Sequence, residues 1–200
     1  MRYWGTTLWE TGRVGELDQI SNQSVMGALA RFASPGAPDR VLWAGAVVVV
    51  TAVGMLRAVR AHRQGDLLVA VTLAGLVSCL VSPVSWTHHL YWLVPAVAVL
   101  VDVAAGAPVT GRVLGGRPRV VAGLAGAGAL LVTTSLCIGT LWFFGEPGKG
   151  QPHQTSLSGV LGEDTYVLLM VVLLVCLPVR ATVRAPAAPR TSAEDAVPVG

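Results

Sequence analysis

The chain has 200 residues, of which 53% are hydrophobic and only 12% are charged, and its mean hydropathy is +0.63. A soluble domain carries about 25% charged residues, roughly twice this share. The composition therefore argues against an ordinary soluble domain. The net charge is +3, but the basic residues do not cluster with aromatic residues as in nucleic-acid-binding proteins, so we expect no nucleic-acid partner.

Five apolar segments are long enough to cross a bilayer, for which a helix needs roughly 20 residues. They are Val41–Val59, Leu67–Val84, Leu90–Pro108, Val120–Phe144 and Thr165–Val179. The fold class predicted is therefore all-α, a multi-pass transmembrane helical protein with about five spans. Cys79, Cys137 and Cys176 all lie inside these segments, and we interpret them as free, buried and small apolar side chains.

Arginines predict the orientation of these spans, because cytoplasmic loops are enriched in basic residues. The loops after the first and third segments and the C-terminal tail carry the arginines of one side, which are Arg57, Arg60, Arg63, Arg112, Arg117, Arg119, Arg180, Arg184 and Arg190. The opposite loops contain a single basic residue, Lys149. We expect a plasma (inner) membrane protein with a cytoplasmic C-terminus.

This topology places residues 1–40 outside, although they contain no apolar stretch that could act as a signal peptide. We therefore expect a fragment of a longer protein, in which residues 1–40 form an extracytoplasmic loop with a short amphipathic helix. Residues 41–179 are the expected transmembrane helical region. Residues 180–200 are rich in Ala and Pro and predict a disordered cytoplasmic tail.

The first candidate binding segment lies in the N-terminal loop. Ser21 or Asn22 would cap a short helix whose apolar face carries Val25, Leu29 and Phe32. Free amides at the start of this helix could hold a phosphate or sugar hydroxyls. The substrate-binding residues expected here are Asn22, Gln23, Ser24 and Arg31. The alternative is a surface helix whose polar residues only face water.

The second candidate segment is Ser82–Trp92, where Pro83 should end the preceding helix. Its aromatic residues suit an interfacial belt, which would explain them without any function. The adjacent histidines are the expected catalytic residues, His88 and His89, because imidazole can transfer a proton or pair with phosphate near neutral pH. Ser82 and Trp86 are the expected substrate contacts beside them.

We expect neither a metal nor a cofactor. Adjacent residues of a helix point about 100° apart, so His88 and His89 cannot readily bind one ion. Asp102 lies within the third span, where a carboxylate is a candidate functional group, but we favour pairing with an arginine or solvation at the cytoplasmic boundary. Asp66, Glu163 and Asp164 are interpreted as ordinary boundary residues.

Members of glycosyltransferase family 87 are similar to this chain in two motifs that follow each other in the same order, Asn22–Arg31 and then Ser82–His89. The segment around Trp4 and Trp9 also resembles that family. Members are polyprenol-phosphate-mannose-dependent alpha-mannosyltransferases of actinobacteria with a multi-pass GT-C fold. The resemblance covers most of residues 1–145, which would correspond to a C-terminal half. It implies a polyprenol-phosphate-sugar donor, a lipoglycan or glycolipid acceptor of the cell envelope, and transfer on the outer face.

The resemblance also implies that the catalytic base lies in an outer loop of the N-terminal half, so we expect this chain to lack it. Expected partners are the membrane lipid, the donor, the acceptor and the missing N-terminal half. Two alternatives remain open, which are a non-enzymatic membrane partner or transport subunit and an inactive truncated remnant.

Overall fold

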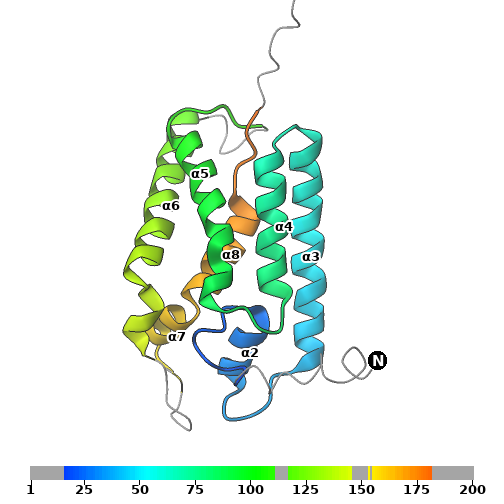
Figure 1. Cartoon of the computed structure of the whole chain (residues 1–200), viewed down its shortest axis with the longest axis vertical. Helices are drawn as coiled ribbons and strands as arrows, with labels where there is room; N and C mark the ends of the chain where they lie inside the picture. Colours follow the sequence, from blue (N-terminus) through cyan, green and yellow to red (C-terminus); the bar gives the residue numbers. More distant parts are fainter. Residues whose placement is uncertain (1–15, 111–116, 146–152, 154, 182–200) are drawn as a thin grey trace, which may run out of the picture.

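A computed structural model of the chain describes residues 16–110, 117–145, 153 and 155–181. These residues form an all-α structure, as the sequence predicts. The α-helices in chain order are α2 (Val25–Ala33), α3 (Arg40–Arg63), α4 (Leu67–Val81), α5 (Leu93–Ala104), α6 (Pro118–Ile138), α7 (Leu157–Glu163) and α8 (Thr165–Cys176). Two 3-10 helices are η3 (Thr87–Trp92) and η5 (Thr140–Phe144). Hairpins α3–α4 and α5–α6 stand side by side, and α8 crosses between them (Figure 1).

Short polar side chains begin several of the helices. Ser24, Asp39, Asp66 and Ser156 each accept a hydrogen bond from a backbone N–H of the first turn that follows. The long helix α6 ends at Gly139, whose φ of 62° lies in the left-handed region that glycine adopts without strain. These particular helix ends therefore have a local cause in the sequence.

Helix α4 lies at the centre of the bundle. Nine of its fifteen residues are buried, whereas only three of the 24 residues of α3 are. Leu73, Leu76 and Leu80 are completely buried in the core, where they pack among residues of α5 and α8. A helix that is apolar on every side is stable only when it is buried, which explains the position of α4.

Every predicted span coincides with a helix, but a count of five full spans is not confirmed. Among the described residues, three helices are long and apolar enough to cross a membrane, namely Arg40–Arg63, Thr87–Ala104 and Pro118–Ile138. Helices α7 and α8 are bent by 73° relative to each other and would together make a fourth. The fifteen residues of α4 span only about 22 Å, less than the hydrocarbon thickness of about 30 Å.

Pro83 accounts for the shortness of α4. The helix stops at Val81, and Ser82 has an extended backbone with ψ of 139°, as the sequence predicts for a residue before proline. The prediction that all three cysteines are buried is wrong. They are free, but only Cys79 is buried, whereas Cys137 and Cys176 are exposed.

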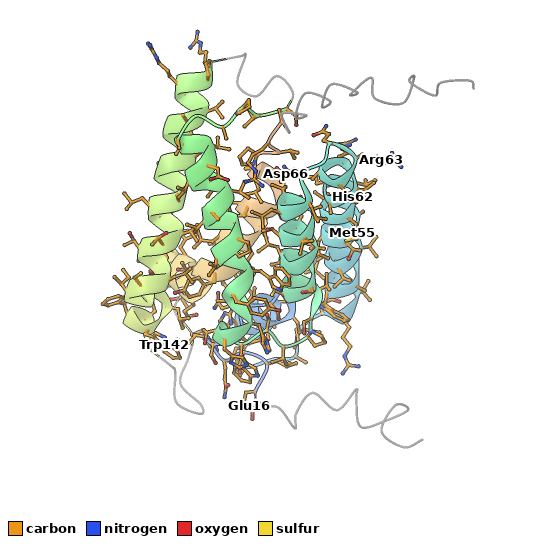
Figure 2. All side chains as sticks on the ribbon, turned by 45° about the horizontal axis from the view of Figure 1, so that its top comes forward. Glu16, Met55, His62, Arg63, Asp66 and Trp142 are labelled. Atoms are coloured by element: carbon orange, nitrogen blue, oxygen red, sulfur yellow. The ribbon has the colours of Figure 1, made fainter. Side chains whose placement is uncertain are left out.

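The two ends of the bundle differ in composition. His62, Arg63 and Asp66 mark one end, and Glu16 and Trp142 mark the other (Figure 2). Arg180 binds Asp66 and so belongs to the same end as Arg63, and α6, which Arg117 precedes, also begins at this end (Figure 1). The described arginine-rich connections thus share one end, and α2, η3 and α7 share the other. Arg112, Lys149, Trp4, Trp9 and the predicted tail from residue 182 onward lie outside the described residues.

Candidate functional site

Both candidate segments meet at the end of the bundle that carries α2. Asn22 forms an isolated β-bridge with Trp86, and its side-chain Oδ1 accepts a hydrogen bond of 2.9 Å from the backbone N–H of Ser85. The Asn22 amide donates to the carbonyls of Leu17 and Pro83, at 2.9 and 3.2 Å. The backbone N–H of Gln23 donates to the Ser85 carbonyl at 2.8 Å. Segments sixty residues apart in sequence are thus joined by paired hydrogen bonds.

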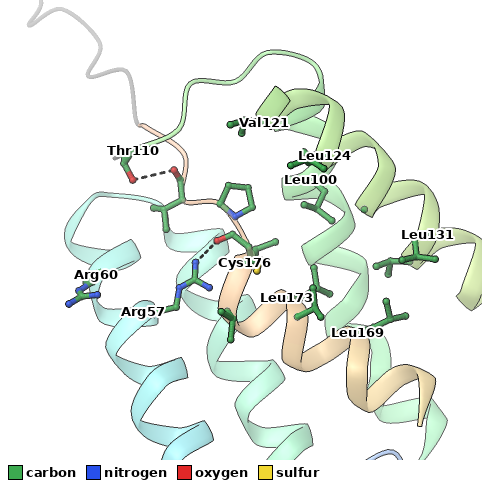
Figure 3. A pocket seen from close by; sticks show the side chains of 18 of the residues that line it. Arg57, Arg60, Leu100, Thr110, Val121, Leu124, Leu131, Leu169, Leu173 and Cys176 are labelled. Atoms are coloured by element: carbon green, nitrogen blue, oxygen red, sulfur yellow. Dashed lines mark hydrogen bonds between the residues drawn. The ribbon is translucent and has the colours of Figure 1, made fainter. Parts of the chain in front are cut away.

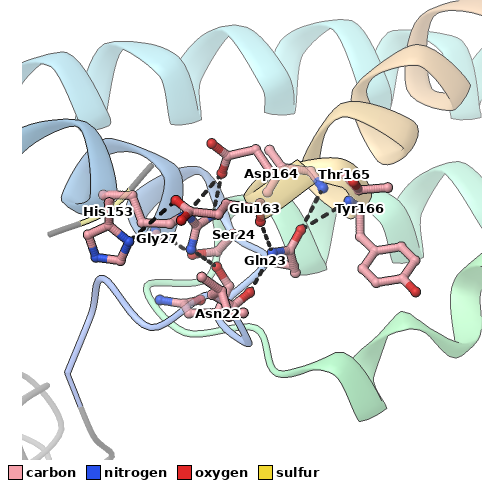
Figure 4. Close-up of polar contacts among 12 residues, drawn as sticks. Asn22, Gln23, Ser24, Gly27, His153, Glu163, Asp164, Thr165 and Tyr166 are labelled. Carbon is pink, nitrogen blue, oxygen red and sulfur yellow. Dashed lines mark hydrogen bonds and ion pairs between the residues drawn. The ribbon is translucent and has the colours of Figure 1, made fainter. Parts of the chain in front are cut away.

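Gln23 connects this pair of segments to the start of α8. Its amide Nε2 donates to the carbonyls of Ile20 and Glu163, at 2.6 and 2.7 Å, and its Oε1 accepts from the N–H groups of Tyr166 and Val167, at 3.0 and 3.1 Å (Figure 4). The side chain is completely buried, and the amide uses both donors and both acceptor positions. Gln23 therefore satisfies helix N-terminal amides that would otherwise be unpaired.

A buried ion pair reinforces the same contact. The guanidinium of Arg31 on α2 donates to the Asp164 carboxylate through Nε and Nη2, and its Nη1 donates to the carbonyls of Gln19 and Asn22, both at 2.9 Å. The Arg31 and Asp164 side chains are only 2% and 8% exposed. Because Asp164 precedes the first residue of α8, its negative charge also suits the helix dipole.

A histidine lies beside this ion pair. His153 Nδ1 is 3.3 Å from the Glu163 carboxylate, and His153 Nε2 is 3.3 Å from Asp18. Glu163 and Asp164 are 2% and 5% exposed, so the interpretation of both as ordinary boundary residues is wrong. Their burial depends on contacts with residues more than 130 positions away, which no local pattern could indicate. We refer to Asn22, Gln23, Ser24, Arg31, Ser85, Glu163 and Asp164 as the polar junction.

The structure also changes the description of α2. Ser24 rather than Ser21 or Asn22 caps the helix, because its Oγ accepts from Gly27 N–H at 3.0 Å and donates to the Pro83 carbonyl at 3.2 Å. The apolar face predicted for α2 is not the face that packs against the bundle. Phe32 is 69% exposed, and the buried face carries Met26, Gly27, Ala30 and Arg31.

A tight contact explains why Gly27 occupies that buried face. A Cβ atom at this position would lie 2.2 Å from the Asn22 carbonyl oxygen, well inside contact distance. The first turn of α2 therefore packs directly on the backbone that carries the Asn22 hydrogen bonds. No larger residue could occupy position 27 without displacing the polar junction.

The histidines lie in the first turn of the 3-10 helix η3, directly after the bridge between Asn22 and Trp86. His88 is exposed, and His89 is partly buried with its ring edge-on to that of His88, 4.3 Å between centroids. The Trp86 N–H donates to His89 Nδ1 at 3.2 Å, so Nδ1 carries no proton in this arrangement. Neutral His89 therefore carries its proton on Nε2, where it can donate a hydrogen bond.

A cavity of about 170 Å³ opens next to His89. Its lining includes Ser82, Ser85 and Trp92, whereas Trp86 and His88 lie outside the lining. Trp92 can pack there because Gly75 on α4 has no side chain. A Cβ atom at position 75 would lie 2.0 Å from the Trp92 ring. In the described part of the chain, no group of three His, Cys, Asp or Glu side chains could hold a metal ion.

At the opposite end, Arg180 joins two carboxylates. It donates to Asp66 through Nη2 at 2.7 Å and through Nε at 3.0 Å, and its Nη1 donates to Asp102. Of the two states expected for Asp102, pairing with an arginine is the one found. Asp66 begins α4 as expected of a boundary residue, but its side chain is also buried against Arg180, which the sequence did not indicate.

The charges of this cluster stabilise one another. Burial raises the pKa of the Asp66 carboxyl, but the hydrogen bonds from Arg180 and from the Val69 N–H outweigh it, so the pKa lies below its ordinary value. The hydrogen bond to Asp66 in turn raises the pKa of the Arg180 guanidinium. Both groups are thus charged across the whole neutral range, and the cluster fixes the segment after α8 to the start of α4.

Comparison with known protein families supports the resemblance seen in the two motifs. Residues 1–83 match the sequence model of glycosyltransferase family 87. The resemblance to this family is thereby confirmed. The matched stretch includes Asn22, Gln23, Ser24 and Arg31 and ends at Pro83, within the second motif segment. No solved structure matches the chain.

Several curated mycobacterial proteins are similar in sequence to about half of this chain. A Mycobacterium tuberculosis polyprenol-phosphate-mannose-dependent alpha-(1-2)-phosphatidylinositol mannoside mannosyltransferase is 37% identical over 98 residues, which cover 49% of this chain and 23% of that protein. The Mycolicibacterium smegmatis protein of the same name is 39% identical over 110 residues, 50% and 24% of the two chains. A Mycobacterium tuberculosis pentamannoside mannosyltransferase is 42% identical over 116 residues, 56% and 26%. The chain thus spans about a quarter of the curated relatives it matches.

Proposed function

We propose that this chain is the portion of a membrane mannosyltransferase that binds a polyprenol-phosphate-mannose donor. The enzyme would transfer mannose to a glycolipid or lipoglycan acceptor of the cell envelope, on the outer face of the plasma membrane. The family match over residues 1–83 and the names of the mycobacterial relatives support the reaction class. The observation that carries the proposal is the polar junction, which joins the Asn22–Arg31 segment to Ser82–His89 at one end of the bundle.

The eight expected site residues divide into two groups in this proposal. Asn22, Gln23, Ser24 and Arg31 are positioning residues, because their buried polar atoms already bond to protein groups. The residues assigned to the donor are Ser82, Trp86, His88 and His89. Ser82 and His89 line the cavity of about 170 Å³, and His88 is exposed beside it. A charge-assisted hydrogen bond from imidazole to phosphate is a strong interaction.

His89 suits the donor phosphate better than it suits the acceptor proton. Its Nδ1 is occupied by the Trp86 N–H, so the ring offers an Nε2–H donor rather than a free lone pair. In the transfer, the acceptor oxygen bonds to the sugar C1 while the C1–O bond to phosphate breaks. A hydrogen-bond donor would stabilise the charge that develops on the leaving phosphate. The base that takes the acceptor proton is assigned to another part of the enzyme.

We propose that the arginine-rich end faces the cytoplasm and that the polar junction lies at the outer face. Arg63, Arg117 and Arg180 at one end support this orientation through the preference of basic loops for the cytoplasm. Reporter fusions after Gln64 and after Gly145 test it. A cytoplasmic signal from a fusion after Gly145 would refute the orientation and leave the reaction class untouched.

A segment exchange tests the function. The matching stretch of the Mycolicibacterium smegmatis relative is replaced by this chain, and membranes are assayed for transfer of labelled mannose from polyprenol-phosphate-mannose to an endogenous glycolipid. We expect transfer by the chimera and a loss of about 10- to 100-fold in His89→Ala, as for removal of a hydrogen bond to a charged group. The matched control is Val94→Ala, an exposed apolar position two residues beyond η3.

Two outcomes would count against the proposal. A chimera that inserts and folds but transfers no mannose would favour a non-enzymatic membrane partner or an inactive remnant. A fully active His88→Ala, His89→Ala double variant would keep the reaction class but remove both histidines from the site.

A further inference from the structure

A second and larger cavity lies on the side of the bundle away from the polar junction. It has a volume of about 590 Å³ and lies between hairpin α5–α6 and helix α8. Near the C-terminal end of α6, helices α6 and α8 are in contact, because the Tyr166 hydroxyl on α8 donates to the Ser135 carbonyl on α6 at 2.7 Å. Farther along, towards the arginine-rich end, α6 and α8 enclose the cavity (Figure 3).

The inner part of this cavity is apolar. Its walls are leucines from three helices, Leu100, Leu124, Leu131, Leu169 and Leu173. Gly128 on α6 also lines it, where a Cβ atom would be 3.5 Å from Leu100 and would still fit. A volume between 300 and 1,000 Å³ with such walls is typical of a ligand site rather than of a packing defect.

The mouth of the cavity is cationic. Arg57 and Arg60 from α3 line it together with Gln64 and Thr110, and none of the lining residues is acidic. Arg57 donates to the carbonyls of Leu174 and Leu177, so its guanidinium is held in place at the end of α8 (Figure 3). Arg60 is exposed, and within the described residues it forms no ion pair with a carboxylate.

The only carboxylates described at this end belong to another cluster. Asp66 and Asp102 both bind Arg180, so they do not neutralise the arginines of the mouth. Arg63 at the end of α3 and Arg117 before α6 do not line the cavity, so Arg57 and Arg60 are the cationic side chains at its mouth. The mouth is therefore the cationic rim of an apolar cavity.

We propose that this cavity binds an anionic phospholipid from the leaflet at the arginine-rich end. One acyl chain would lie between α6 and α8, and the phosphate would lie at Arg60 with Arg57 beside it. Basic pockets between transmembrane helices are known sites for anionic lipid head groups, and the leucine walls suit a hydrocarbon chain. The charge at the mouth favours this occupant over an apolar helix, which would leave the arginines without a counter-charge.

Lipid retention tests the proposal. The full chain is purified from nanodiscs that contain equal amounts of phosphatidylglycerol and phosphatidylcholine, and bound lipid is counted by native mass spectrometry. We expect retained phosphatidylglycerol in the wild type and about a fivefold lower preference for it in Arg60→Gln, the effect of one basic residue near a membrane surface. Arg63→Gln is the matched control, since Arg63 is on the same helix but does not line the cavity.

A steric pair of variants tests the acyl-chain part independently. Gly128→Leu should fill the cavity and remove bound lipid of both kinds, whereas Gly123→Leu should not. Gly123 is on the same helix, has open space around it and does not line the cavity. Helix content measured by circular dichroism confirms that both variants fold.

Three results would overturn the proposal. They are equal retention of the two lipids by the wild type, unchanged preference in Arg60→Gln, and a dimer mass that Gly128→Leu abolishes. The last result would assign the cavity to a second copy of the chain. None of these results bears on mannosyl transfer, because no residue of the polar junction lines the cavity.

Discussion

Arg31 and Asp164 are 133 positions apart in sequence and form a buried ion pair that attaches α2 to the start of α8. Both side chains are nearly inaccessible to water, so each depends on the other for its charge to be tolerated. Through this pair and Gln23, the bend between α7 and α8 supports the backbone of Asn22. The segment that carries the first motif is thus fixed by the last helix of the bundle.

Arg31→Met should destabilise the protein strongly, because it leaves the Asp164 carboxylate buried without a counter-charge. The expected loss in the free energy of unfolding is about 3–5 kcal/mol. Thermal unfolding in detergent measures it, with the exposed Arg40→Met as control. The double variant Arg31→Met, Asp164→Leu should recover part of the loss. If Arg31→Met melts with the wild type, the pair does not hold α2.

Asn22→Ala should loosen the Ser82–His89 segment, since it leaves the buried Ser85 N–H without its acceptor at a cost of about 1–3 kcal/mol. The Pro83 carbonyl keeps only its hydrogen bond from Ser24. Cys79 reports this opening because it is buried and its Sγ donates to the His89 carbonyl at 3.4 Å. In a background with Cys137 and Cys176 changed to Ala, maleimide should label Cys79 faster in Asn22→Ala. Thr110→Ala, at the opposite end, should label at the wild-type rate.

Gly75→Ala should displace the Trp92 ring from α4 and cost about 1–3 kcal/mol, as for other overpacked cores. A glycine in an open helical position behaves oppositely, because alanine has the higher helix propensity by about 1 kcal/mol. Gly123→Ala on α6 is such a position and should stabilise the protein. The comparison of the two unfolding temperatures separates the contact with Trp92 from helix propensity. Similar shifts in both variants would contradict the packing argument.

Acid should weaken the Asp66–Arg180 cluster. The folded-state pKa of Asp66 lies below its ordinary value of 3.8, so the contribution to stability is complete above that value and is lost as pH falls through the folded pKa. Arg180 remains charged over this range because its pKa is raised. Unfolding temperatures at pH 7 and pH 3 should differ less in Asp66→Asn than in the wild type. Asp39→Asn, in an exposed cap, should retain the wild-type difference.

Conservative replacements of His89 should separate its two nitrogens. Asparagine can reproduce the Nδ1 acceptor for the Trp86 N–H, whereas glutamine places an amide donor near the position of Nε2. In the chimeric enzyme, His89→Asn should retain wild-type stability and lose mannosyl transfer, because the Nε2–H group that hydrogen-bonds the phosphate is absent. His89→Gln should melt lower but retain more transfer. If His89→Asn retains more mannosyl transfer than His89→Gln, the functional role belongs to Nδ1 instead.

Some of the candidate site was accessible from the sequence. Pro83 ends α4 because its ring and missing N–H act locally, and the pairing of Asp102 with an arginine follows from the cost of an isolated charge near lipid. The order of the two motifs indicated the family that residues 1–83 match. The substrate-binding and catalytic roles of the eight site residues remain predictions.

Other parts were not accessible because they depend on distant residues. The apolar face of α2 was predicted from Val25, Leu29 and Phe32. The face that is buried is instead the one where Gly27 packs against Asn22 and Arg31 binds Asp164. Glu163 and Asp164 have the sequence context of residues at a helix boundary. Only the approach of α2 and His153 makes them buried partners.

The sequence by itself determined the all-helical membrane character, the end of α4 before Pro83 and the separation of arginine-rich from arginine-poor connections. These properties arise from hydropathy, local hydrogen bonding and charge, which act over a few residues. The tertiary structure alone decided that Gln23 bonds to α8, that Arg180 joins two carboxylates and that a cationic cavity opens between α6 and α8. Buried polar groups must find partners wherever the chain brings them, and sequence spacing does not record which partners those are.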